Sequence, residues 1–352
     1  MTSTLSTRFS RLVAVAGLAL LPVNALAADA TQPALPYKLE KTIPLGDGER
    51  WDYVTYASGR AYVAHGDHVS VVDLAKGAVI GEIGTMPGGT HGIGISGADG
   101  VGFTDDGKAG VAVAFDLQSL KVLKQIPAAP DADGIVFDPV SRHIFVIEGD
   151  SGTISVIDPK TRSSIATIKI GAALEAGVVD GKGKLFVDGA ANHDIVAIDT
   201  ATNAVTAHFA MPGCVGPHGI AVDAENDRIF ATCANKVMVV VNAKDGTNIA
   251  TLPIGGYNDG AVFDPARKLA LSANGDGTLT VVAEKDADHF AIAATVPTAL
   301  SARTIAIDPA SGRLYLPAAD IAKIDPPAQP GGRPHVSFVP HSFRLLVFAP
   351  TP

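Results

Sequence analysis

Seven short apolar segments of this chain each begin next to a residue that can bind a ligand or transfer a proton. The residues at these starts comprise a tryptophan, two arginines, two histidines and four carboxylates: Arg50, Trp51, Asp52, His91, Asp133, Glu175, His218, Asp259 and Arg303. Imidazole and carboxylate groups can bind a divalent cation such as Zn²⁺ or Mn²⁺. Alternatively, a histidine beside a carboxylate can act as an acid or base while an arginine holds an anionic substrate.

The elements that must bring these residues together belong to a repeat of about 42 residues. Its clearest copy runs from 133 to 171 and reads as four apolar strands separated by turns. Seven copies align, with starts near 51, 91, 133, 176, 218, 259 and 303. A repeat of this length built only from strands and turns predicts an all-β, seven-bladed β-propeller. The first residues of the innermost strands would then line one mouth of its central channel.

The last repeat lacks an outer strand of its own. A matching segment, KLEKTIPLG, stands at residues 38–46. We therefore predict that the ring closes by an N-terminal outer strand added to the last blade, which would leave no open sheet edge. Residues 28–352 form a single propeller domain in this interpretation. A Pro/Gly-rich insertion at 318–342 is predicted to be a surface loop over one end of the ring, with a functional lid as the alternative.

The first 27 residues have the pattern of a secretory signal peptide. Arg8 and Arg11 precede an apolar run at 12–21, and Ala25-Leu26-Ala27 is a small-residue cleavage site. The run is too short to span a bilayer as a helix, and we expect no membrane span after cleavage. An uncleaved anchor is the alternative. The pattern predicts an exported, periplasmic protein.

The charge of the chain argues against nucleic acid as a partner. The formal net charge is −9, and it becomes −11 when Arg8 and Arg11 leave with the signal. Binding to phosphates requires clustered Lys and Arg, and no basic block is present. The expected partner is a small molecule or a periplasmic protein, and a monomer is the expected state.

Two cysteines, Cys214 and Cys233, precede and end a predicted hairpin. A disulfide is permitted in an exported protein and neighbouring hairpin positions can meet its geometry, while two free buried thiols are the alternative. Their spacing fits neither a zinc knuckle nor haem attachment, and no nucleotide-binding motif is present. The cofactor is therefore unknown, with a divalent metal as the open possibility.

The mouth residues support two hypotheses. In the first, the propeller binds a small molecule, metal or partner protein at the channel mouth without an assigned reaction. In the second, it is a metal-assisted hydrolase or lyase of lactonase type. The catalytic candidates are His91, His218 and Arg303; the metal candidates are His91, His218, Asp133 and Asp259; His65, at the end of a second strand, could reach the same mouth. His91 and His218 lie three repeats apart, so they could face each other across water rather than share a metal.

The repeat text resembles the YncE-like, YVTN-type β-propellers of exported bacterial proteins. The resemblance covers essentially all of 28–352 and is carried by these segments: WDYV (51–54), YVAHGDHVSVVD (62–73), HGIGIS (91–96), DGIVFDP (133–139), GVVDGKGKLFV (177–187), HGIAVD (218–223), GDGTLTVV (275–282), RTIAIDPASGRLYLP (303–317) and VPHSFRLLVF (339–348). It implies a seven-bladed periplasmic propeller but no assigned reaction. It also places His91, Asp133, Glu175, Asp259 and Arg303 at the family's mouth positions. His218 departs from the small polar residue expected there.

Overall fold

The computed structural model describes residues 1, 35–48, 50–327 and 335–351. Apart from Met1, the predicted signal segment 1–27 lies outside the described residues. The unit Leu35–Pro352 contains seven four-stranded antiparallel sheets and one two-stranded hairpin among its described residues. No helix in this described part is long and apolar enough to cross a membrane.

The first three sheets follow the chain in order, from the innermost to the outermost strand. The first contains β2 (Val54–Ala57), β3 (Arg60–His65), β4 (His68–Asp73) and β5 (Ala78–Ile83). The second contains β6 (Gly94–Ser96), β7 (Val101–Asp106), β8 (Val111–Asp116) and β9 (Val122–Pro127), with a 3₁₀ turn at Gly97–Asp99. The third contains β10 (Ala132–Phe137), β11 (Ile144–Glu148), β12 (Thr153–Asp158) and β13 (Ser163–Lys169).

The next three sheets repeat the arrangement. The fourth contains β14 (Gly177–Val179), β15 (Lys184–Gly189), β16 (Asp194–Asp199) and β17 (Ala204–Ala210). The fifth contains β18 (Pro217–Asp223), β19 (Arg228–Cys233), β20 (Val237–Asn242) and β21 (Asn248–Pro253). The sixth contains β22 (Asn258–Asp264), β23 (Leu269–Asn274), β24 (Asp276–Asp286) and β25 (His289–Leu300).

The seventh sheet joins the two ends of the described unit. Its strands are β26 (Ala306–Ile307), β27 (Leu314–Ala318), β30 (Phe343–Pro350) and, outermost, β1 (Tyr37–Gly46). β1 pairs antiparallel with β30 from Tyr37 to Gly46. The β1 side chains of Tyr37, Ile43 and Leu45 are buried.

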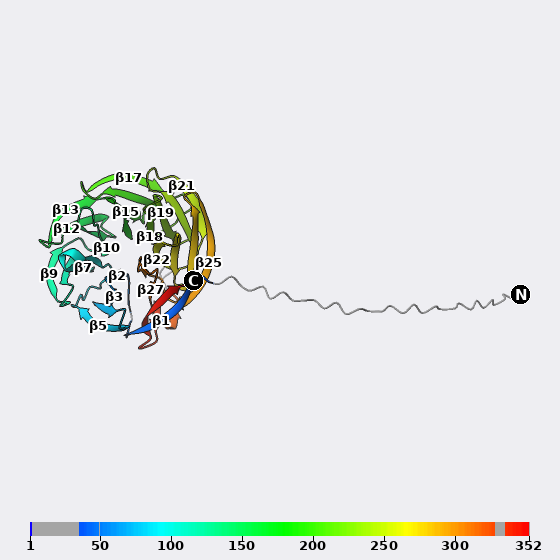
Figure 1. Cartoon of the computed structure of the whole chain (residues 1–352), viewed down its shortest axis with the longest axis horizontal. Coiled ribbons are helices and arrows are strands. Elements are labelled where there is room, and N and C mark those ends of the chain that lie inside the picture. Colours follow the sequence, from blue (N-terminus) through cyan, green and yellow to red (C-terminus); the bar gives the residue numbers. More distant parts are fainter. Residues whose placement is uncertain (2–34, 49, 328–334, 352) are drawn as a thin grey trace. The chain divides into compact units, whose positions relative to one another are not determined.

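The sheets are arranged in a circle, as Figure 1 shows. The innermost strands β6, β10, β14, β18 and β22 contact one another in this order, and β26 of the seventh sheet contacts both β22 and β2. A separate apolar cluster fills each of the seven contacts between neighbouring sheets. Both faces of each sheet are therefore covered near the centre, which explains the nearly continuous apolar runs in the second and third strands. The chain is an all-β, seven-bladed propeller, as the repeat predicts.

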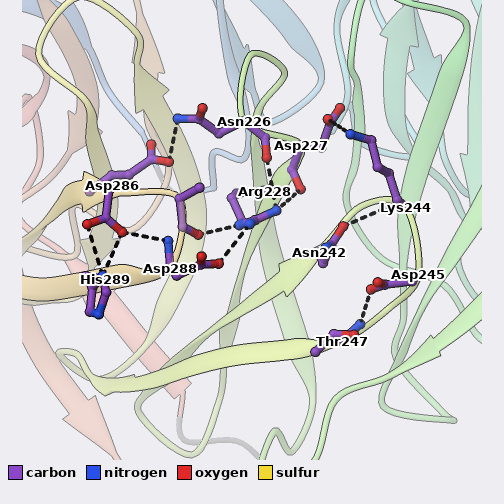
Figure 2. A network of polar contacts seen from close by, with 12 residues as sticks. Asn226, Asp227, Arg228, Asn242, Lys244, Asp245, Thr247, Asp286, Asp288 and His289 are labelled. Carbon is purple, nitrogen blue, oxygen red and sulfur yellow. Dashed lines mark hydrogen bonds and ion pairs between the residues drawn. The ribbon is translucent and has the colours of Figure 1, made fainter.

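A buried arginine connects the fifth and sixth blades at the end away from the inner-strand starts (Figure 2). The Arg228 side chain donates to the carbonyl of Ala287 over 2.5 Å and to Asp288 Oδ1 over 3.1 Å, both in the turn between β24 and β25. It also donates to the carbonyls of Asn226 and Asp227. Because each of these bonds involves a charged donor, the contact fixes the long sixth-blade hairpin against the fifth blade.

The insertion at 318–342 contains a hairpin in its described part. β28 (Ile321–Asp325) pairs with β29 (His335–Phe338). Phe338 at the end of β29 lies with its ring centroid 4.7 Å from that of Trp51. The insertion therefore contributes a side chain to the channel mouth.

The two cysteines form a disulfide whose Cα atoms are 5.5 Å apart. Cys214 lies in the loop before β18 and Cys233 ends β19. Both are buried in the apolar cluster between the fourth and fifth blades. The bond fixes the loop that leads into His218.

Candidate functional site

The pairing register defines one equivalent residue per blade at the channel mouth. In the first blade Val54 pairs with Val63, and Asp52 stands two residues before Val54. In every other blade, the equivalent residue stands two positions before the inner-strand residue that lies opposite the counterpart of Val63 in the second strand. The seven residues are Asp52, His91, Asp133, Glu175, His218, Asp259 and Arg303. The sequence alignment started two blades one residue off, because the register places Asp52 and Glu175 in the ring rather than Trp51 and Ala176. We call these seven residues the mouth ring.

Three adjacent members of the mouth ring converge. Ligand atoms of Glu175, His218 and Asp259 all lie within 4.8 Å of one another. His218 Nδ1 is 3.4 Å from Glu175 Oε1 and 3.9 Å from Asp259 Oδ1. Bonds of about 2.0 to 2.2 Å to a tetrahedral cation separate ligand atoms by roughly 3.3 to 3.6 Å. The separation between His218 and Glu175 already fits this range, and the rest of the cluster must contract to bind such a cation.

Arg303 fixes the Asp259 side of this cluster. Its Nε donates to Asp259 Oδ2 over 2.6 Å, and Nη2 donates to the carbonyl of Trp51 over 2.7 Å. The guanidinium also lies over the Trp51 ring, 5.6 Å from its centroid. One oxygen of Asp259 is thus held by Arg303 while the other faces His218.

A buried carboxyl lies behind Glu175. Asp188 on β15 is fully buried, and neither carboxyl oxygen has a hydrogen-bond partner among the described residues. Burial, then the charge of Glu175, raise the pKa of Asp188 well above its usual range. A buried carboxyl without a partner is costly unless it is protonated or compensated by a cation.

In the second blade, the equivalent position holds the carboxyl of Asp105, which orients His91. Asp105 Oδ2 lies 2.7 Å from His91 Nδ1, and Oδ1 accepts the backbone N–H groups of His91 and Gly92. Burial raises the pKa of Asp105, partly offset by His91. Burial alone would lower the pKa of His91, but the hydrogen bond to Asp105 and the charges of Asp105, Asp133 and Asp52 raise it to about 9. His91 is therefore a cation at neutral pH, with Nδ1 committed to Asp105.

Burial, and after it crowded negative charge, raises the pKa of two carboxyls of the mouth ring. Burial, then the charge of Asp259, raise the pKa of Asp52 to about 7, against the effects of Arg303 and His91. Burial, then the charges of Asp52 and Glu175, raise the pKa of Asp133 well above its usual range. A cation bound close to these carboxyls would lower their pKa values again, because it favours the ionised form.

Tyr53 crosses the channel below the mouth ring. Although it belongs to the first blade, its side chain packs on the apolar cluster between the fourth and fifth blades. A smaller cavity of about 140 Å³ lies along the inner strands on its far side, lined by Tyr53, Thr55, Gly92, Gly134 and Gly177 among others.

Two adjoining cavities open at the mouth. One of about 320 Å³ is lined by Arg50, Trp51, Asp52, His91, Arg303 and Phe338. The other, of about 620 Å³, shares Arg50 and Phe338 and is lined by His65. His65 is buried, and its Nδ1 lies 2.9 Å from Ser70 Oγ. It therefore lies beside the mouth ring rather than in it.

The structure groups the predicted residues in a way that the repeat alone did not define. His218 and Asp259 meet in one cluster, joined by Glu175, which was predicted to bind ligand but was not among the metal candidates. His91 and Asp133 are outside that cluster, and His91 pairs with Asp105 instead. Asp105 and Asp188 were missed. Each could have been recognised from the sequence as an acid within an otherwise apolar second strand. The equivalent residues of three other blades are Ala64, Ile147 and Ala273.

No protein-family model matches the sequence, and a search of curated proteins gives no match. Among solved structures, the chain is similar to hydrazine synthase of Kuenenia stuttgartiensis, with a TM-score of 0.67 and 15% sequence identity. The similarity covers 78% of this chain and 93% of that chain. At this identity the comparison supports the class of protein, a seven-bladed β-propeller, and no shared activity.

Proposed function

We propose that this chain is an exported binding propeller whose channel mouth holds a divalent cation on Glu175, His218 and Asp259. The observation that carries the proposal is the convergence of one imidazole and two carboxylates from three blades within 4.8 Å. The predicted signal peptide at 1–27 and the resemblance to YncE-like propellers support a periplasmic location.

The chemistry of this donor set fits Zn²⁺ or Mn²⁺. Both ions accept imidazole nitrogen and carboxylate oxygen, and three protein ligands leave a position open for water or a ligand. Burial and the charge of Glu175 raise the pKa of Asp188, and a cation bound at the cluster would offset the charge of Glu175. The hydrogen bond from Arg303 orients Asp259, which is the role that outer residues have around metal ligands.

Metal analysis of protein purified without an affinity tag tests the proposal. We expect about one equivalent of Zn²⁺ or Mn²⁺ per chain and a raised melting temperature, since a ligand at 100 times its Kd adds about 2.7 kcal/mol of stability. Glu175→Gln and Asp259→Asn should each weaken cation binding at least tenfold, because substitutions of even the outer residues cost about 10- to 100-fold. Glu225→Gln is the matched control, because Glu225 is 77% exposed and pairs with Lys268 instead.

Substoichiometric metal together with an unchanged melting temperature in added Zn²⁺ and Mn²⁺ would contradict the proposal. Equal binding by the Glu175→Gln, Asp259→Asn and Glu225→Gln variants would place the cation elsewhere.

A metal-assisted hydrolase or lyase is the second candidate, and the His91–Asp105 pair favours it. A histidine fixed through one nitrogen by a buried carboxylate can use the other nitrogen for proton transfer. The test is hydrolysis of a lactone such as dihydrocoumarin by metal-loaded protein. We expect His91→Gln to lower the rate at least about 100-fold while metal stoichiometry is unchanged. A rate that survives both His91→Gln and metal removal would exclude this candidate.

A further inference from the structure

The cavity of about 320 Å³ at the mouth has a mainly cationic wall. Arg50, His91 and Arg303 line it, and Asp52 is the only carboxylate among the described lining residues. The carboxylates of Asp105 and Asp259 bind His91 and Arg303 but do not line the cavity. This wall favours an anion although the chain as a whole is acidic.

Two cationic groups converge over Gly89. A Cβ atom at this glycine would lie 3.5 Å from Arg50 Nη2 and 3.8 Å from His91 Nε2, while Gly89 itself has a φ of +99°. Both nitrogens therefore border the same open space, which exists because residue 89 has no side chain. His91 keeps Nε2 directed away from Asp105, since Nδ1 bonds that carboxylate. An oxyanion above Gly89 could accept from both groups.

Another part of the wall is aromatic. Trp51 is 3% exposed and packs against Phe338 at 4.7 Å and Phe343 at 4.9 Å between ring centroids. Its indole Nε1–H is buried and has no acceptor among the described residues. The wall combines an anion-binding side with a flat apolar side.

We propose that this cavity binds a small organic carboxylate, with Arg50 and His91 holding the carboxylate over Gly89 and Trp51 and Phe338 covering the carbon skeleton. The proposal deepens the proposed function, because it names the ligand class of the same channel mouth. It does not require the cation on Glu175, His218 and Asp259. The two can therefore fail separately.

Trp51 is the only tryptophan in the chain, so its fluorescence reports directly on the cavity. The experiment titrates metal-free and Zn²⁺-loaded protein with succinate at pH 7, with the neutral succinamide and with inorganic phosphate in parallel. We expect a saturable change with succinate, confirmed by calorimetry, and none with succinamide. Arg50→Gln and His91→Gln should each weaken succinate binding at least tenfold. The matched control is Arg142→Gln, which should bind succinate normally. Arg142 is an exposed residue of the third blade and pairs with Asp99 of the second blade.

Several results would overturn the proposal: no saturable response to succinate, an equal response to succinamide, binding of phosphate alone, or unchanged affinity in Arg50→Gln. Arg50 is exposed, so this last variant tests the idea even if His91→Gln disturbs the buried Asp105. Succinate binding by protein that takes up no metal would support this inference and contradict the cation site. Stoichiometric metal without succinate binding would do the reverse.

Discussion

Deletion of residues 35–46 is expected to abolish cooperative folding of the propeller. The deletion removes β1, which pairs with β30 over its whole length and buries Tyr37, Ile43 and Leu45. Burying each such side chain contributes about 1.5 to 3 kcal/mol, and a typical domain is stable by only about 5 to 15 kcal/mol. The loss also exposes the edge of β30, which is a site for aggregation. Circular dichroism and urea unfolding of the soluble fraction measure the effect.

Point variants in β1 test its contribution to stability in smaller steps. Ile43→Ala should destabilise by about 2 to 4 kcal/mol, since Ile43 is 1% exposed in the cluster between the seventh and first blades. Thr42→Ala, next to it but exposed, should change stability by no more than about 0.5 kcal/mol. A truncated protein with the same unfolding midpoint as the full chain would show that β1 is dispensable.

The repeat predicted the blades because their physical cause is local. Each second and third strand is a short apolar run bounded by turn residues, and that pattern can be recognised seven times without knowing any contact. The alignment of the repeats also predicted which residues stand at the mouth, since a fixed position before each inner strand must face the same end of the circle. Only Trp51 and Ala176 were one residue away from the true equivalents.

The grouping within the ring could not be predicted in the same way. Which members converge depends on side-chain length and direction across the channel, and the repeat says nothing about either. Glu175 joins His218 and Asp259, whereas His91 turns to Asp105 in its own blade. Phe338 reaches Trp51 from an insertion that has no equivalent in the other blades. Asp105 and Asp188 could have been noticed, because an acid within a buried strand must be protonated or compensated by a partner.

Asp105→Asn is expected to lower the pKa of His91 from about 9 to below its ordinary value near 6.5. Burial disfavours the imidazolium, and the bond to Asp105 is the largest effect that opposes it. Asp133, Asp52 and Arg50 also face His91. The two carboxyls have raised pKa values, so near neutral pH they stabilise the imidazolium of His91 less than fully ionised carboxylates would. A proton NMR titration measures the pKa, with His91→Gln used to assign the resonance among ten histidines.

The same substitution should change how stability depends on pH. A histidine whose pKa is raised in the folded state stabilises the protein fully below its unfolded pKa, and this contribution is lost as the pH rises through the folded value. The wild-type free energy of unfolding should therefore fall between about pH 6.5 and 9, by an amount of the order of 3 kcal/mol. Asp105→Asn should remove most of this slope in urea unfolding at a series of pH values. An unchanged slope, or a His91 resonance that still titrates near pH 9 in the variant, would show that Asp105 does not hold the proton on His91.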